Sequence, residues 1–112
     1  MRPDALQKAL GFDDLGILPA DRSNIASRKE VDTSTKLSRN ITLQYPIVVS
    51  PMDTISDVEM CIAVNSIGAA AILHRFMPIK EQSEKAYDIK RKTGRSYAAV
   101  GLQDYRERVP SL

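Results

Sequence analysis

Short apolar runs and longer amphipathic segments alternate along the second half of the chain. The apolar runs cover residues 47–49, 69–73 and 97–100, and continuous runs of this length predict buried strands. The segments between them, 56–68 and 78–94, carry apolar residues on one helical face and predict helices. This order repeats at roughly 25 to 30 residues, which is typical of (β/α) units with parallel strands.

Sequence signals mark the ends of the predicted helices. Ser56 stands three residues before Glu59, a capping-box spacing that predicts the start of the first helix. Gly68 and Gly94 stand where a left-handed residue commonly closes a helix. Three parallel strands joined by two such helices leave open sheet edges and a small core. The chain is therefore expected to be the front part of a larger barrel or a chain that needs a partner.

The first 45 residues carry weak periodicity and many turn-forming residues. Residues 12–19 predict a short strand or turn, and residues 22–35 predict an irregular loop. Leu37, Ile41 and Leu43 predict one or two short, half-buried strands around a bend.

The stretch 46–54 is the most informative candidate for a functional site. Residues 47–49 predict a strand buried on both faces, and Pro51 restricts the backbone where that strand ends. Polar residues follow directly. Because α/β folds keep ligand sites at the carboxyl ends of parallel strands, this loop is expected to contact a ligand.

Composition narrows the class of protein. The 112 residues are 43% hydrophobic and 27% charged, with a formal net charge of +2. This charge argues against nucleic-acid binding, and no apolar run of about 18 residues predicts a membrane span. A single cysteine excludes an internal disulfide and fits a reducing compartment, and no signal-peptide core is present, so a cytoplasmic protein is expected.

The isolated Cys61 and His74 limit the chemistry that this chain can perform. Cys61 lies on the apolar face of the first predicted helix and is expected to be buried and inert. His74 has no second histidine or cysteine with which to form a metal site. A structural or contact role is favoured for it, with acid–base catalysis as the alternative.

Six segments, in order and with compatible spacing, resemble the inosine monophosphate (IMP) dehydrogenase and guanosine monophosphate (GMP) reductase family. They are GFDD (11–14), VDTSTKL (31–37), RNITL (39–43), PIVVSPMDT (46–54), GAAAILHRFM (68–77) and AAVG (98–101). The resemblance implies the N-terminal portion of a TIM (β/α)8 barrel. Residues 1–45 would form an N-terminal extension, and residues 46–112 about three βα units that end within the third helix.

The family resemblance also implies the function, a purine nucleotide oxidoreductase that assembles as a homotetramer. The dehydrogenase oxidises IMP to xanthosine monophosphate with NAD, in guanine nucleotide biosynthesis. The reductase deaminates GMP with NADPH. Ser50-Pro51-Met52 favours the dehydrogenase, whereas Arg22-Ser23-Asn24-Ile25 favours the reductase. The dehydrogenase is the preferred interpretation, and the reductase remains the alternative.

The resemblance assigns the loop after the first strand to the purine nucleotide. Ser50 would hydrogen-bond the nucleotide, Met52 would pack against the purine, and Pro51 would shape the turn. Asp53 and Thr54 would brace the loop.

The ends of the second and third strands would contact the nicotinamide cofactor. The residues implied there are His74, Arg75 and Gln103, with Leu102 as a weaker candidate.

The family's catalytic Gly-Ser-x-Cys-x-Thr loop does not occur in these 112 residues, so no residue is assigned as catalytic. The phosphate-binding glycines and the monovalent-cation loop do not occur either, although such a cation is expected in a complete enzyme. This chain alone is expected to be inactive. Two further interpretations stay open: a non-catalytic nucleotide-binding or interaction protein, and an unrelated small α/β domain.

Overall fold

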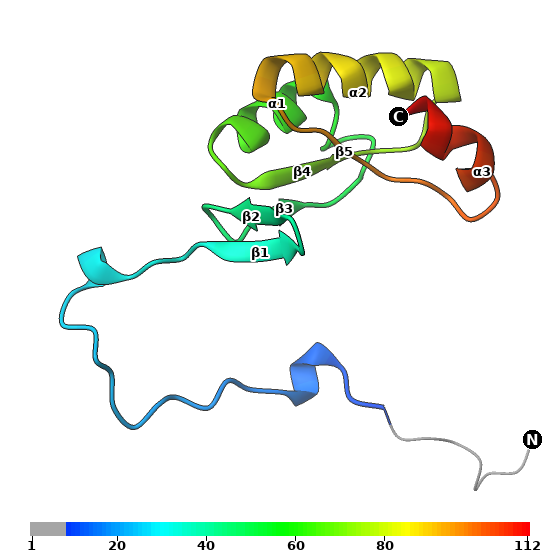
Figure 1. The fold of residues 1–112 in the computed structure, drawn as a ribbon. Coiled ribbons are helices and arrows are strands. Elements are labelled where there is room, and N and C mark those ends of the chain that lie inside the picture. Colours follow the sequence, from blue (N-terminus) through cyan, green and yellow to red (C-terminus); the bar gives the residue numbers. More distant parts are fainter. Residues whose placement is uncertain (1–8) are drawn as a thin grey trace, which may run out of the picture. The chain divides into compact units, whose positions relative to one another are not determined.

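The computed structural model describes residues 9–112, which divide into two compact units between Val31 and Asp32 (Figure 1). In the first unit, two single-turn 3-10 helices interrupt an irregular chain: η2 (Phe12–Asp14) and η3 (Arg28–Glu30). The expected strand or turn at 12–19 is thus a turn. The division into an extension and a barrel portion at residue 45 stays a prediction.

The second unit begins with an antiparallel hairpin. Strands β1 (Thr35–Ser38) and β2 (Ile41–Leu43) pair around the expected bend, with a register irregularity between Lys36 and Ser38. Leu43 is only 1% exposed. The prediction of short strands on either side of a bend is confirmed.

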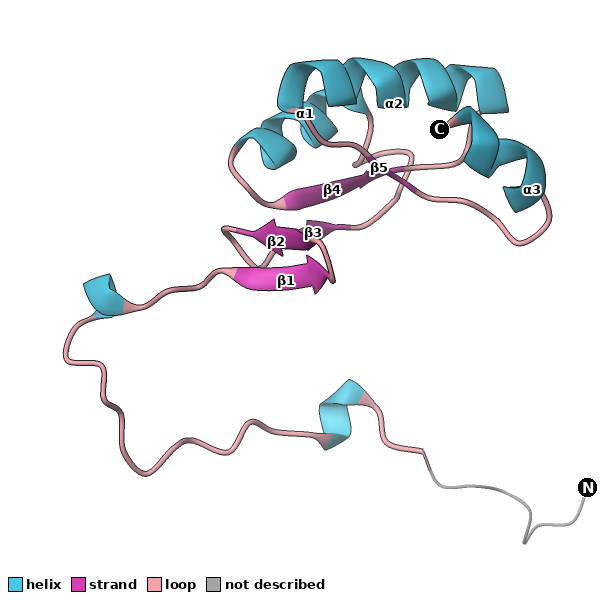
Figure 2. Cartoon of the chain, viewed as in Figure 1, coloured by secondary structure: helices cyan, strands magenta, loops and turns pink. Residues whose placement is uncertain are grey.

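Three parallel strands form the sheet that the apolar runs predicted. They are β3 (Val48–Val49), β4 (Ala70–Leu73) and β5 (Tyr97–Ala98), in the order β3-β4-β5 (Figure 2). The outer strands contain only two residues each, shorter than the apolar runs that predicted them. The parallel direction places the carboxyl ends of all three strands at one edge of the sheet.

Helices α1 (Val58–Ser66) and α2 (Ile79–Thr93) pack on each other, and α1 packs on β4 (Figure 1). The core between helices and sheet consists of Cys61, Ala71, Leu73, Ala86 and Ile89. Burying an aliphatic side chain such as Ile89 stabilises the fold by roughly 1.5–3 kcal/mol. The mixed α/β class is therefore confirmed.

Gly68 and Gly94 end the two helices with positive φ angles of 87° and 74°, as predicted. The capping box of Ser56 and Glu59 is wrong: α1 begins one residue later, where the carboxylate of Asp57 accepts the Val58 N–H at 2.8 Å. Ser56 is instead fully buried, because its hydroxyl donates to the Met52 carbonyl at 3.3 Å.

Burial of the first strand on both faces is also wrong for the described residues. Ile47 is 56% exposed and Val48 is 45% exposed. The physical reason is that β3 is an edge strand and the helices lie on one side of the sheet.

After β5 the chain forms one helical turn, α3 (Tyr105–Arg108), followed by the 3-10 helix η4 (Val109–Ser111). Pro110 stands in η4, where a missing N–H costs little. Across residues 9–112, no helix is long and apolar enough to span a membrane.

Candidate functional site

The carboxyl edge of the sheet brings three chain segments together. They are residues 50–54 after β3, residues 74–76 after β4 and residues 99–104 after β5. The sequence-predicted contacts all lie in these segments. Whether they bind ligands stays a prediction, and the geometry below describes what the edge offers.

The loop after β3 is held by its main chain and leaves its side chains free. The Met52 carbonyl accepts the N–H of Ile55 at 3.0 Å and that of Ser56 at 2.8 Å. All five residues from 50 to 54 are exposed, and Met52 is 48% exposed. The loop can therefore present a hydroxyl, a thioether and a carboxylate from a fixed backbone.

Ser56 connects this loop to the end of β4. Its carbonyl accepts the N–H of His74 at 3.4 Å and the thiol of Cys61 at 3.7 Å. Because Ser56 is fully buried, the loop cannot move away from β4 without breaking these contacts.

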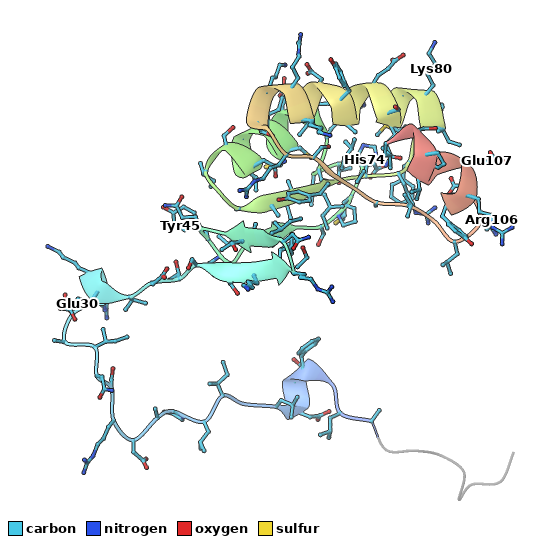
Figure 3. The ribbon with its side chains drawn as sticks, in the orientation of Figure 1. Glu30, Tyr45, His74, Lys80, Arg106 and Glu107 are labelled. Carbon is cyan, nitrogen blue, oxygen red and sulfur yellow. The ribbon has the colours of Figure 1, made fainter. Side chains whose placement is uncertain are left out.

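His74 is nearly buried, with 5% of its surface exposed. Its Nδ1 accepts the N–H of Phe76 at 3.3 Å, so the neutral ring carries its proton on Nε2. The two rings stack with centroids 6.1 Å apart. Figure 3 shows His74 lying inside the fold, whereas Lys80 projects outward from α2.

Arg75 offers an unpaired charge at the same edge. Its guanidinium lies 5.4 Å from the centre of the exposed Phe76 ring, and within residues 9–112 it forms no ion pair. A pocket of about 410 Å³ is lined by Arg75, Leu102, Gln103 and Asp104. The structure thus brings Arg75 and Gln103 together, and an exposed guanidinium there suits an anionic group such as a phosphate.

Two buried polar residues of this region were missed by the sequence analysis: Gln82 and Arg108, which are 0% and 6% exposed. The Gln82 amide donates to the carbonyls of His74 and Ala99, so it joins the ends of β4 and β5. A signal was available, because Gln82 falls on the same helical face as the apolar Ala86 and Ile89.

Cys61 is fully buried, and burial raises the pKa of its thiol to about 11. Because the thiolate is the reactive form, this thiol is inert near neutral pH. The expectation of a buried structural cysteine is confirmed.

A second hollow, of about 480 Å³, lies at the opposite, amino edge of the sheet. Its polar lining includes Asn40, Lys90, Arg95, Ser96 and Tyr97. Since parallel α/β folds bind ligands at the carboxyl edge, the carboxyl edge is the candidate site.

Residues 9–112 match the family model described as the IMP dehydrogenase / GMP reductase domain. The IMP dehydrogenase of Nitrosopumilus maritimus is 41% identical over 85 residues, which are 76% of this chain and 18% of that protein. The GMP reductase of Leishmania donovani is 44% identical over 86 residues, which are 77% of this chain and 17% of that protein.

The fold is similar to that of a solved GMP reductase from Trypanosoma brucei in complex with guanosine 5'-triphosphate. The TM-score is 0.67 at 43% identity, over 79% of this chain and 20% of that one. A second structure of that enzyme, in complex with GMP, gives the same TM-score. The chain thus spans about a fifth of the length of these relatives.

Proposed function

The chain belongs to the IMP dehydrogenase / GMP reductase family, and from that premise we propose that it supplies the first ligand-contacting strand ends of a TIM-barrel purine nucleotide oxidoreductase. The observation that carries the proposal is the assembly of three strand ends at one edge. Ser56, His74 and Gln82 link these ends through hydrogen bonds. The preferred reaction is NAD-dependent oxidation of IMP to xanthosine monophosphate.

In this proposal the loop after β3 binds the purine nucleotide. The exposed hydroxyl of Ser50 hydrogen-bonds the nucleotide, and the exposed thioether of Met52 packs against the purine ring. Pro51 shapes the turn, while Asp53 and Thr54 brace it. The hydrogen bonds to the Met52 carbonyl keep this loop in one conformation before the nucleotide arrives.

The segments after β4 and β5 bind the nicotinamide cofactor, which supplies hydride transfer when bound. The residues fit such a group, because Arg75 presents an unpaired guanidinium and Gln103 an exposed amide beside one pocket. His74 contributes through its small exposed surface and through its main chain, which orients Arg75.

Reductive deamination of GMP with NADPH is the second candidate. The similarity to GMP reductases that bind guanine nucleotides supports it. The dipeptide Ser50-Pro51 followed by Met52 supports the dehydrogenase.

The covalent chemistry on the purine requires a nucleophile that residues 9–112 do not present. Cys61 is buried, and its raised pKa keeps it protonated. A non-catalytic nucleotide-binding protein is therefore the third candidate. In the complete enzyme, the catalytic cysteine lies outside this segment, the protein is a cytoplasmic homotetramer, and a monovalent cation supports the reaction.

The test is a spectrophotometric assay at 340 nm with the protein at its complete natural length. Formation of NADH from IMP and NAD is expected. Oxidation of NADPH with GMP alone would assign the reductase. Binding of either nucleotide without turnover would favour the non-catalytic protein, and no binding at all would contradict the proposal.

A further inference from the structure

Gln82 uses its whole side-chain amide to join two neighbouring strand ends. Its Nε2 donates to the His74 carbonyl at 3.0 Å and to the Ala99 carbonyl at 2.9 Å. Both amide hydrogens are therefore engaged, and Oε1 is left as the acceptor. Gln82 is fully buried, so no water replaces these contacts.

Arg108 fills that acceptor position from the helical turn after β5. Its Nη1 donates to Oε1 of Gln82 at 2.8 Å. The same guanidinium contacts the Met77 carbonyl at 3.3 and 3.4 Å, and Oδ2 of Asp104 at 2.9 and 2.7 Å. These five contacts match the five N–H groups of a guanidinium, so the buried charge is fully paired.

Asp104 connects this buried group to the pocket beside Arg75. It pairs with Arg108 and is also one of the four residues that line the pocket. Gly101 passes so close to Arg75 that a Cβ at this position would lie 2.7 Å from a guanidinium nitrogen. The position of the segment 101–104 therefore determines the space in front of Arg75.

Gln82 and Arg108 do not line that pocket. They hold its two sides instead, because Gln82 bonds the residue next to Arg75 and Arg108 bonds Asp104. We infer that Gln82 and Arg108 are a positioning pair that sets the distance between Arg75 and Gln103, and with it the affinity for the nicotinamide cofactor. This inference rests on the proposed function, since it concerns the same cofactor site.

The test compares variants of the complete-length protein. Gln82→Met keeps the volume of the side chain and removes its hydrogen bonds, and Arg108→Lys keeps the charge and removes the fork. Each is expected to raise KM for NAD, or for NADPH if the protein is a reductase, by about tenfold, because small misplacements of binding groups are costly. KM for the purine nucleotide should change by less than about twofold.

A matched control separates positioning from stability. Ile89→Val removes a methylene from the fully buried core beneath the same helix, without touching either side chain. It is expected to lower thermal stability and leave both KM values unchanged. Because the two residues act as one unit, the double variant should raise the cofactor KM no more than the worse single variant.

The outcomes distinguish the inference from the proposed function. If the wild-type protein binds neither NAD nor NADPH, the proposed function falls and the inference falls with it. If the wild-type protein binds the cofactor and both variants keep its KM, the inference alone is overturned. Equal increases in KM for cofactor and nucleotide would also overturn it. If Gln82→Met does not fold, Arg108→Lys decides by the same criteria.

Discussion

The ammonium group of Lys85 on α2 lies 3.0 Å from the carboxylate of Asp57, the residue that caps α1. One carboxylate therefore both begins a helix and holds it to its neighbour. Burial alone would raise the pKa of Asp57, but the hydrogen bonds from Lys85 and from the Val58 amide hold it below its usual value.

Replacing Lys85 with methionine is expected to destabilise the protein by about 0.2–1 kcal/mol, since both side chains are partly exposed and screened by solvent. The lowered pKa of Asp57 contributes stability above the unfolded-state carboxyl pKa of about 4, and this contribution is lost as pH falls. Lys85→Met should therefore weaken the acid dependence of urea unfolding below neutral pH. The control is Lys80→Met, whose exposed partner Glu84 lies 4.0 Å away. Equal curves for both variants would contradict the account.

Gly68→Ala is expected to destabilise the protein more than Gly94→Ala. Both positions have positive φ angles, which cost an L-residue about 1–2 kcal/mol. A Cβ at Gly68 would also lie 2.8 Å from the Cβ of Gln44, whereas nothing lies within 4 Å of one at Gly94. Denaturant titration of both variants gives the comparison. A smaller loss for Gly68→Ala would show that the loop around Gln44 adjusts freely.

Cys61 is expected to resist thiol reagents in the native protein. It is fully buried, and its thiol pKa is raised to about 11. Its reaction with an aromatic disulfide reagent should be slow at pH 8 and become fast once urea unfolds the protein. Fast labelling in buffer would contradict the burial of this helix face.

Ser50→Ala and Met52→Ala are expected to weaken the binding of IMP by roughly three- to tenfold, which corresponds to about one lost contact each. Thermal stability should stay nearly unchanged, because both side chains are exposed. Isothermal titration and thermal unfolding provide the two measurements, with Ser38→Ala on exposed β1 as the control. A loss of stability with unchanged affinity would show that the loop is only structural.

The sequence predicted the order of elements well because local signals determined it. The run of residues 69–73 and the glycines at 68 and 94 identify β4 and both helix ends without tertiary information. The start of α1 could not be placed as well, because Ser56 and Asp57 are both good caps. Burial of Ser56 against Met52 decides between them.

The predicted site shows the same limit. Chain direction alone places residues 50–54 and 74–75 at one edge, so their proximity could be expected. The bonds from Gln82 to two strand ends, and from Arg108 to Gln82, join residues 17 and 26 positions apart. No local pattern encodes such contacts, since they depend on how α2 and α3 pack together.

The central claim is that the carboxyl edge of the sheet binds the purine nucleotide and the cofactor. Hydrogen–deuterium exchange of the complete-length protein, with IMP and NAD added separately, tests it most directly. IMP is expected to slow exchange in residues 50–56, and NAD in residues 75–76 and 101–104. Residues 94–97, at the amino edge, should exchange as before. Binding of both ligands with protection confined to 94–97 would contradict the claim.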